Sequence, residues 1–112
     1  MPIRLPAPIA AYFDAESRDD GEALSQAFAE DGVVLDEGHV IQGWAAIEHW
    51  LAETRRKYRH TVKPLASATD GDETSVTCRL SGSFPGSPIK VRFIFKVDSN
   101  KITSLAIRSS DP

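Results

Sequence analysis

The stretch VVLDEGHVIQGWAAI, from Val33 to Ile47, has two short apolar runs on either side of a polar turn. Apolar, β-branched runs around a glycine-containing turn predict a β-hairpin, here Val33–Asp36 paired with His39–Gln42. A Gly-Trp step then opens an apolar pattern with helical spacing, so a helix should follow directly. Asp36 is therefore expected where an apolar strand ends. It is either an ordinary turn residue or the acidic group of a pocket.

Three helices are predicted in the first half of the chain. The first covers Pro8 to about Ser17, where apolar residues recur at helical spacing. Asp20 can cap a second helix, whose apolar stripe includes Phe28 and which should end near Asp31-Gly32. The third helix should extend from Trp44 to about Tyr58, and its basic last turn complements the helix dipole.

The second half of the chain predicts β-structure. Four segments rich in β-branched and aromatic residues are separated by turns that contain Gly, Pro, Asp or Asn. Helices followed by a run of strands are typical of an α+β fold, with the helices on one face of an antiparallel sheet. The predicted strands are Thr61–Thr69, Thr74–Phe84, Ile89–Asp98 and Lys101–Arg108.

Alternation along these strands assigns their side chains to the two faces of the sheet. The arginines of the strands fall on the outer face, so none is expected inside. Ile94, joined by Leu105 and Ile107 if the last strand points them the same way, would leave apolar area outside. Such an area predicts that a partner subunit covers it. The residues expected to face the helices are Val76, Cys78, Leu80, Val91, Phe93, Phe95 and Val97.

Composition and charge exclude several classes of protein. The chain has 112 residues, of which 41% are hydrophobic and 26% charged, with a formal net charge of −3. These values are typical of one globular domain, residues 1–112. The acidic balance argues against nucleic-acid binding, and no apolar run is long enough to span a bilayer. The first residues lack the apolar stretch of a secretory signal, so we expect a cytoplasmic protein.

The sequence also lacks the common motifs for metals and cofactors. Cys78 is the only cysteine, which excludes a cysteine-based metal cluster, and its place in an apolar strand predicts a small core residue. There is no glycine-rich phosphate loop, no His-Glu-x-x-His motif and no Gly-x-Ser-x-Gly motif. We therefore expect neither a metal nor a cofactor.

The run AFAEDGVVLD, Ala27 to Asp36, is followed by GWAAI, Gly43 to Ile47, at a helix start. Together with the element order, which covers nearly the whole chain, it resembles the nuclear transport factor 2-like superfamily, and within it the SnoaL-like and ketosteroid-isomerase-like proteins. The resemblance implies a cone, in which a strongly curved antiparallel sheet wraps the first helix and leaves an apolar pocket. It also implies a homodimer joined through the outer sheet face.

The resemblance assigns roles to two residues. Asp36 matches the carboxylate that moves a proton in ketosteroid isomerases, and Tyr12 matches the tyrosine that donates a hydrogen bond to the developing oxyanion. The isomerases have a second donor, a protonated aspartic acid, and the best match here is Phe93, which cannot donate. Loss of one such donor costs roughly a hundred- to a thousandfold in rate. The missing donor therefore favours either a substrate other than a steroid or a protein that catalyses no reaction.

Each of the other candidate site residues has both a functional and a structural interpretation. His39 either assists Asp36 or is a surface residue of the hairpin, whereas His49 and His60 are expected on the surface. Tyr12 either donates to a ligand or packs in the core. Several aromatic residues are expected to be core, although some must line any pocket. The aromatic residues proposed as pocket lining are Phe13, Phe28, Trp44, Trp50, Phe93 and Phe95.

The superfamily includes isomerases, polyketide cyclases, dehydratases, epoxide hydrolases and proteins without catalysis, so fold alone does not fix function. The leading hypothesis is a small pocket protein that binds a mainly apolar molecule bearing a carbonyl or hydroxyl group. Asp36 would then transfer a proton without a cofactor, in an isomerase, cyclase or dehydratase reaction. The alternative is a non-catalytic binding or dimeric assembly module, whose pocket is filled by its own aromatic side chains.

Overall fold

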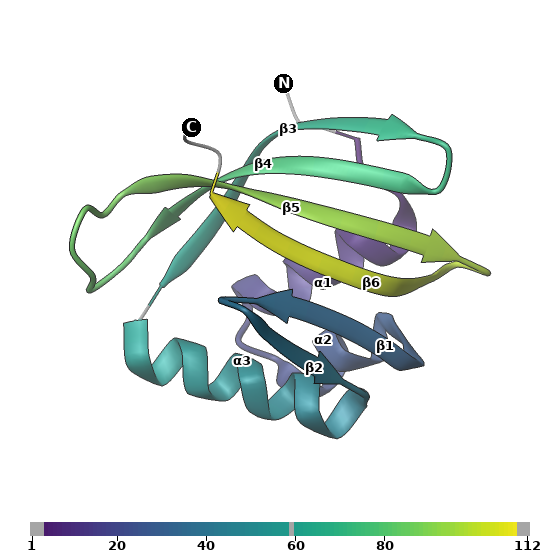
Figure 1. Cartoon of the computed structure of the whole chain (residues 1–112), viewed down its shortest axis with the longest axis horizontal. Coiled ribbons are helices and arrows are strands. Elements are labelled where there is room, and N and C mark those ends of the chain that lie inside the picture. Colours follow the sequence, from purple (N-terminus) through teal and green to yellow (C-terminus); the bar gives the residue numbers. More distant parts are fainter. Residues whose placement is uncertain (1–3, 59, 110–112) are drawn as a thin grey trace.

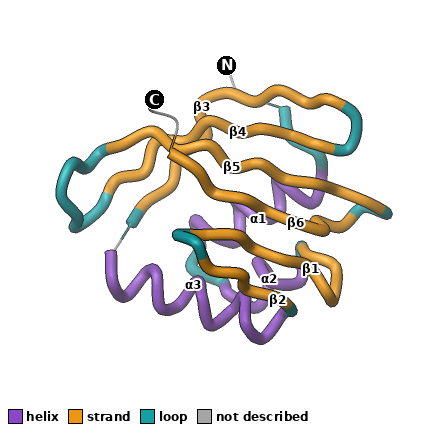
Figure 2. The backbone as a smooth tube through the Cα atoms, in the orientation of Figure 1, coloured by secondary structure: helices purple, strands orange, loops and turns teal. Residues whose placement is uncertain are grey.

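The computed structural model describes residues 4–58 and 60–109. Three helices pack on one face of a curved, open sheet of six strands (Figures 1 and 2). The α+β class and the helix order predicted from the sequence are confirmed. The helices are α1 (Ala7–Ser17), α2 (Gly21–Gln26) and α3 (Trp44–Tyr58), and the strands are β1 (Phe28–Asp36), β2 (His39–Gln42), β3 (Thr61–Asp70), β4 (Glu73–Ser81), β5 (Ile89–Asp98) and β6 (Lys101–Ser109).

The strands lie in the order β2-β1-β6-β5-β4-β3. The predicted antiparallel meander from β3 to β6 is confirmed, but β1 pairs with β6 in parallel, so the sheet is mixed rather than wholly antiparallel. A parallel pair needs a long crossover, and here the chain from β2 to β5 supplies it. This pairing joins the β1–β2 hairpin to the meander and brings Asp36 beside the C-terminal half of β6.

The second helix is shorter than its apolar stripe predicts. It ends at Gln26, and Phe28 begins β1 instead of continuing the helix. Phe28 is fully buried and pairs with Ile102 of β6, and the main-chain N–H of Ile102 donates to the carbonyl of Ala27 at 3.0 Å. Pairing with a strand far along the sequence therefore overrides the local helical pattern.

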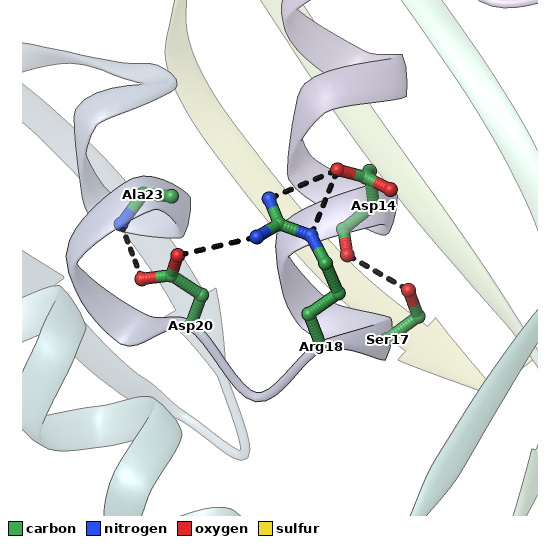
Figure 3. Close-up of polar contacts among 5 residues, drawn as sticks. All are labelled: Asp14, Ser17, Arg18, Asp20 and Ala23. Atoms are coloured by element: carbon green, nitrogen blue, oxygen red, sulfur yellow. Dashed lines mark hydrogen bonds and ion pairs between the residues drawn. The ribbon is translucent and has the colours of Figure 1, made fainter.

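Charged side chains hold the turn between α1 and α2 (Figure 3). Asp20 caps α2 as predicted, because its carboxylate accepts a hydrogen bond from the main-chain N–H of Ala23 at 3.1 Å. Arg18 lies between two acidic residues, 2.9 Å from Asp14 and 3.4 Å from Asp20. These charged side chains are largely exposed, so their ion pairs add little to stability.

The predicted inner faces of β4 and β5 are confirmed for their central residues, which are buried. The condition stated for β6 is not met, because Leu105 is opposite Phe95 and Ile107 is opposite Phe93, so both lie on the helix-facing side and not with Ile94. A register shift between Lys96 and Val97 sets this alignment. A bulge changes which side chains share a face, and the alternation alone does not reveal it.

An aromatic cluster fills the space between α1 and the sheet. Tyr12 of α1 is 1% exposed, and its ring makes edge-on contacts with Phe13 at 5.1 Å and Phe95 at 5.4 Å between centroids. Phe93 packs against the same rings. Such edge-to-face pairs stabilise a core by more than the burial of their apolar area alone.

Among the helices that the structure describes, none is long and apolar enough to cross a membrane.

Candidate functional site

A small internal hollow, here called the inner cavity, lies where α1, α3 and the strand ends meet. Its volume is about 70 Å³. A wider, open depression of about 610 Å³, the outer groove, lies between the β1–β2 hairpin and α3. Both spaces are lined by Asp36, Glu37, Trp50 and Thr54, so they adjoin at these residues. The other residues that line the inner cavity are Tyr12, Leu51, His60, Val62, Leu80, Phe93 and Ile107.

Asp36 is half-buried at the end of β1, between the inner cavity and the outer groove. The indole N–H of Trp50 donates a hydrogen bond to its Oδ2 at 3.0 Å. Burial raises the pKa of Asp36 above its ordinary value, since a desolvated carboxylate loses the hydration of its charged form. The bond from Trp50 opposes this rise, Glu37 adds to it, and the nearby His39 and His60 oppose it.

Tyr12 reaches the same cavity from α1. Burial raises the pKa of Tyr12 well above its ordinary value, and the negative charges of Glu16 and Asp36 act in the same direction. The side chain is therefore a neutral phenol at physiological pH, which can donate a hydrogen bond. The two residues that the resemblance singled out, Tyr12 and Asp36, thus line one cavity. A carboxylate base beside a phenol donor suits proton removal next to a carbonyl.

The remaining candidates divide between the two spaces and the core. Phe93 lines the inner cavity and Trp50 lines both spaces. His39 is exposed and, of these two spaces, lines the outer groove. Phe13 and Phe95 are buried in the aromatic cluster and line neither space.

Phe28 and Trp44 lie apart from Asp36. They line a separate open depression, where the indole N–H of Trp44 donates to the main-chain carbonyl of Phe28 at 2.9 Å. Phe28 and Trp44 therefore do not share the space that Asp36 lines, and their role in ligand binding stays a prediction. Trp44 contacts Phe28 at the start of β1, whereas the inner cavity is lined by Asp36 at the end of the same strand.

His60 is the residue that sequence reasoning misplaced. It was expected on the surface after a basic run, but it is 7% exposed, and its Nε2 lies 3.2 Å from Oε2 of Glu16. Glu16 follows Tyr12 by four residues on α1, so both lie on the buried face of the helix. An acidic residue within an apolar helical stripe was a signal that a basic partner lies inside the fold.

Within residues 4–58 and 60–109, no group of three or more His, Cys, Asp or Glu side chains is arranged to hold an ion. Cys78 is buried, as predicted, and burial raises the pKa of its thiol to about 12. A thiol in that state is a core residue rather than a nucleophile.

A curved, open sheet wrapped around a leading helix is the architecture of the nuclear transport factor 2-like fold. The family follows from direct comparison. The chain belongs to the SnoaL-like domain family, whose model matches residues 9–105.

Solved structures agree with this assignment. A candidate polyketide cyclase from Sinorhizobium meliloti is 40% identical, with 93% of this chain and 95% of that chain covered and a TM-score of 0.90. A protein with a ketosteroid isomerase-like fold from Catenulispora acidiphila, in complex with trimethylamine, is 23% identical. The match covers 96% of this chain and 88% of that chain, with a TM-score of 0.83.

A third similar structure is TerC co-crystallised with polyporic acid, which is 15% identical, with 93% and 89% of the two chains covered and a TM-score of 0.82. At this identity the likeness shows the fold alone. No curated protein is similar enough to match the chain.

Proposed function

We propose that this protein binds a small, mainly apolar molecule that bears a carbonyl or hydroxyl group, and that Asp36 exchanges a proton with it. In the reaction, the Asp36 carboxylate removes a proton from the carbon next to the carbonyl. The C–H electron pair moves toward the carbonyl oxygen, where the Tyr12 hydroxyl donates a hydrogen bond to the developing negative charge. The protonated Asp36 then gives the proton to a different carbon of the bound molecule or, after cyclisation, to the new alkoxide oxygen, which restores the carboxylate.

One observation carries this proposal, namely that Asp36 and Tyr12 line the same cavity while burial raises the pKa of Asp36. A carboxylate with a raised pKa is a stronger base than a solvated one and still ionises near neutral pH. The 40% identical candidate polyketide cyclase favours cyclisation among the possible reactions, because an enolate formed in this way can attack a second carbonyl of the same molecule.

The size of the inner cavity favours the second candidate function, a non-catalytic binding or assembly module. Its volume of about 70 Å³ is well below the roughly 150 Å³ of a cavity that admits benzene. Phe93 and its aromatic neighbours occupy space that a ring-shaped ligand would need. Under the enzyme proposal, the reacting end of the ligand enters the inner cavity, and its body lies in the outer groove beyond Trp50.

A proton-exchange assay separates the two candidates. The probe is acetone in D2O, which is small enough for a narrow cavity and exchanges carbon-bound hydrogen for deuterium when a base removes a proton next to its carbonyl, as followed by proton NMR. We expect a saturable rate that increases with pH as Asp36 ionises, with a midpoint above the usual aspartate range. Asp36→Asn should lower this rate about a hundredfold or more.

The matched control is Asp31→Asn, which changes an exposed carboxylate of the same strand. It should leave the rate unchanged. A wild-type rate no greater than that of an equal concentration of acetate would reject the enzyme proposal and favour the non-catalytic binding module.

We also infer a homodimer joined through the outer sheet face. One row of uncharged side chains crosses the strands β2, β1, β6 and β5 there, made up of Val40, Leu35, Ala106 and Ile94. Val40 is 69% and Leu35 39% exposed, which is high for side chains of this kind. An exposed apolar row on a sheet is the kind of surface that a second copy of a chain covers.

Ile94→Asp tests this interface, since it places a charge in the middle of the row. We expect the variant to sediment as a monomer at concentrations where the wild type sediments as a dimer. Ala45→Asp is the control, because it adds the same charge at an exposed position in the first turn of α3, away from the row. Identical sedimentation of wild type and Ile94→Asp would refute the outer-face dimer.

A further inference from the structure

The outer sheet face carries basic residues at one end. Lys63 of β3 is directly opposite Arg79 of β4, and Arg79 is directly opposite Lys90 of β5. Further along the same face, Arg92 of β5 is opposite Arg108 of β6. These five exposed side chains are here called the basic patch. Like charges at directly opposite strand positions destabilise a sheet, so the patch favours a negatively charged partner.

Acidic residues gather where β3 turns into β4 and where β5 ends, which is the opposite end of these strands (Figure 1). The main-chain N–H of Val97 donates to the carbonyl of Asp72 at 3.0 Å, so the two turns lie side by side. Lys96 is opposite Glu73, and Lys101 donates to a main-chain carbonyl at 2.8 Å, but the carboxylates outnumber these two lysines. The exposed acidic residues, here called the acidic end, are Asp70, Asp72, Glu73 and Asp98.

An uncharged row lies between the basic patch and the acidic end. It is the row of the proposed dimer interface, which continues from Ile94 through Ser75 of β4 to Ala68 of β3 and so crosses all six strands. On β5, Lys90 and Asp98 lie four residues from Ile94 in opposite directions, which is roughly 13 Å along the strand. The outer face therefore changes from positive to negative across this row.

Two copies joined through this face have few possible orientations. Homodimers have two-fold symmetry, and sheets in aligned face-to-face packing keep their strands within about 30° of each other. The two-fold axis then lies either along the strands or along the row. With the axis along the row, each strand lies over its own counterpart in the reverse direction, so the basic patch of one copy faces the acidic end of the other. With the axis along the strands, between Leu35 and Ala106, β3 and β4 extend with their charges beyond the edge of the other copy.

We propose that the outer-face dimer has its two-fold axis along the uncharged row, so that the basic patch of each copy binds the acidic end of the other. This inference rests on the proposed homodimer and gives it an orientation that the apolar row alone does not fix. Lys63 and Arg79 then face the β3–β4 turn of the second copy. Arg92 comes close to Lys96 of the partner subunit, and the adjacent Glu73 of the partner subunit offsets this repulsion.

Two charge-reversed variants test the orientation by sedimentation at low salt. The patch variant, Lys63→Glu with Arg79→Glu, reverses the part of the basic patch on β3 and β4. The turn variant, Asp70→Lys with Asp72→Lys, reverses the turn that should face it. Each variant alone should raise the dimer dissociation constant at least about tenfold, because like charges then meet at both symmetric contacts.

An equimolar mixture of the patch variant and the turn variant should recover the affinity of the wild type. In the mixed dimer, the reversed patch of one chain faces the reversed turn of the other, so opposite charges meet at both contacts. Recovery also shows that both variants are folded. The controls are Arg56→Glu and Glu48→Lys, which reverse exposed charges on α3, away from the outer sheet face, and should leave the dissociation constant unchanged.

A nitroxide spin label at Ala68→Cys measures the direction of the axis. Cys78 is buried, so the label attaches to the new cysteine. Ala68 lies in the uncharged row on the edge strand β3. With the axis along the row, the two labels face each other across packed sheets about 10 Å apart, so we expect a distance below about 20 Å. With the axis along the strands, the two β3 strands lie at opposite edges, roughly 30 Å or more apart.

The results separate this inference from the proposals on which it builds. If Ile94→Asp dissociates the dimer but the patch and turn variants do not, or if their mixture fails to recover, the orientation is overturned while the dimer stands. A label distance of roughly 30 Å or more overturns it as well. If the wild type sediments as a monomer at every concentration, both the dimer and its orientation fail. The proton transfer at Asp36 is independent of all these results.

Discussion

Glu16 and Asp36, two acidic side chains close to the inner cavity, differ in their partners. Glu16 is almost fully buried, and two basic side chains face its carboxylate. Asp36 is only half-buried, and it receives a hydrogen bond from a neutral indole. Burial alone therefore does not make a carboxylate reactive. The charge of the buried Glu16 is compensated by Arg55, whereas the less buried Asp36, whose hydrogen-bond donor is a neutral indole, has its pKa raised by burial and can exchange a proton.

The largest expected effect comes from removing the cation that compensates Glu16. Arg55→Met keeps most of the side-chain volume but leaves the carboxylate with one partner, so we expect a loss of about 2 kcal/mol in the free energy of unfolding. The figure is below that for a fully buried pair, because the Arg55 side chain is 23% exposed. Urea unfolding measures it.

The neighbouring Arg56→Met is the control, since the Arg56 side chain is 72% exposed and pairs with Glu53 on the surface of α3. It should change stability little. Equal losses in the two variants would mean that the charge of Glu16 needs no compensation, and the contrast with Asp36 would not hold.

A smaller effect of opposite sign is expected at Asp36. Because its pKa is raised in the folded protein, the folded state binds the proton more tightly than the unfolded chain does. Ionised Asp36 thus destabilises the fold above its folded-state pKa. Asp36→Asn should stabilise the protein by about 0.5–1 kcal/mol at pH 7.

This gain should disappear as the pH falls below the ordinary aspartate pKa, where Asp36 is protonated in both states. Thermal unfolding across pH 3 to 8 measures the difference. A gain that does not change with pH would show that it comes from packing rather than from the charge of Asp36.

The smallest expected effect comes from removing the indole N–H of Trp50. Trp50→Phe removes the hydrogen bond that favours ionised Asp36, so the pKa of Asp36 should rise further, as measured by carbon-13 NMR of its carboxyl group. Trp44→Phe removes an indole N–H that donates to a main-chain carbonyl instead, and it should leave the pKa of Asp36 unchanged. An unchanged pKa in Trp50→Phe would mean that the bond does not stabilise the carboxylate.

Much of the fold was predictable from the sequence, because helix and strand periods are local properties. The hairpin, the third helix, the meander and the inner faces of β4 and β5 each follow from spacing within a short window. The resemblance then placed Asp36 and Tyr12 in one hollow, as the structure has them. The outer groove lies beside the same hairpin, but its size could not be predicted, since it depends on how α3 packs.

What the sequence by itself determined is the order of the elements, the period of each one and the acidic end of β1. Only the tertiary structure decided that β1 pairs with β6, that Leu105 and Ile107 turn inward, and that His60 lies against Glu16. The reason is physical. Strand pairing, register shifts and buried ion pairs join residues far apart in the chain, and their energies depend on distances that no local pattern contains.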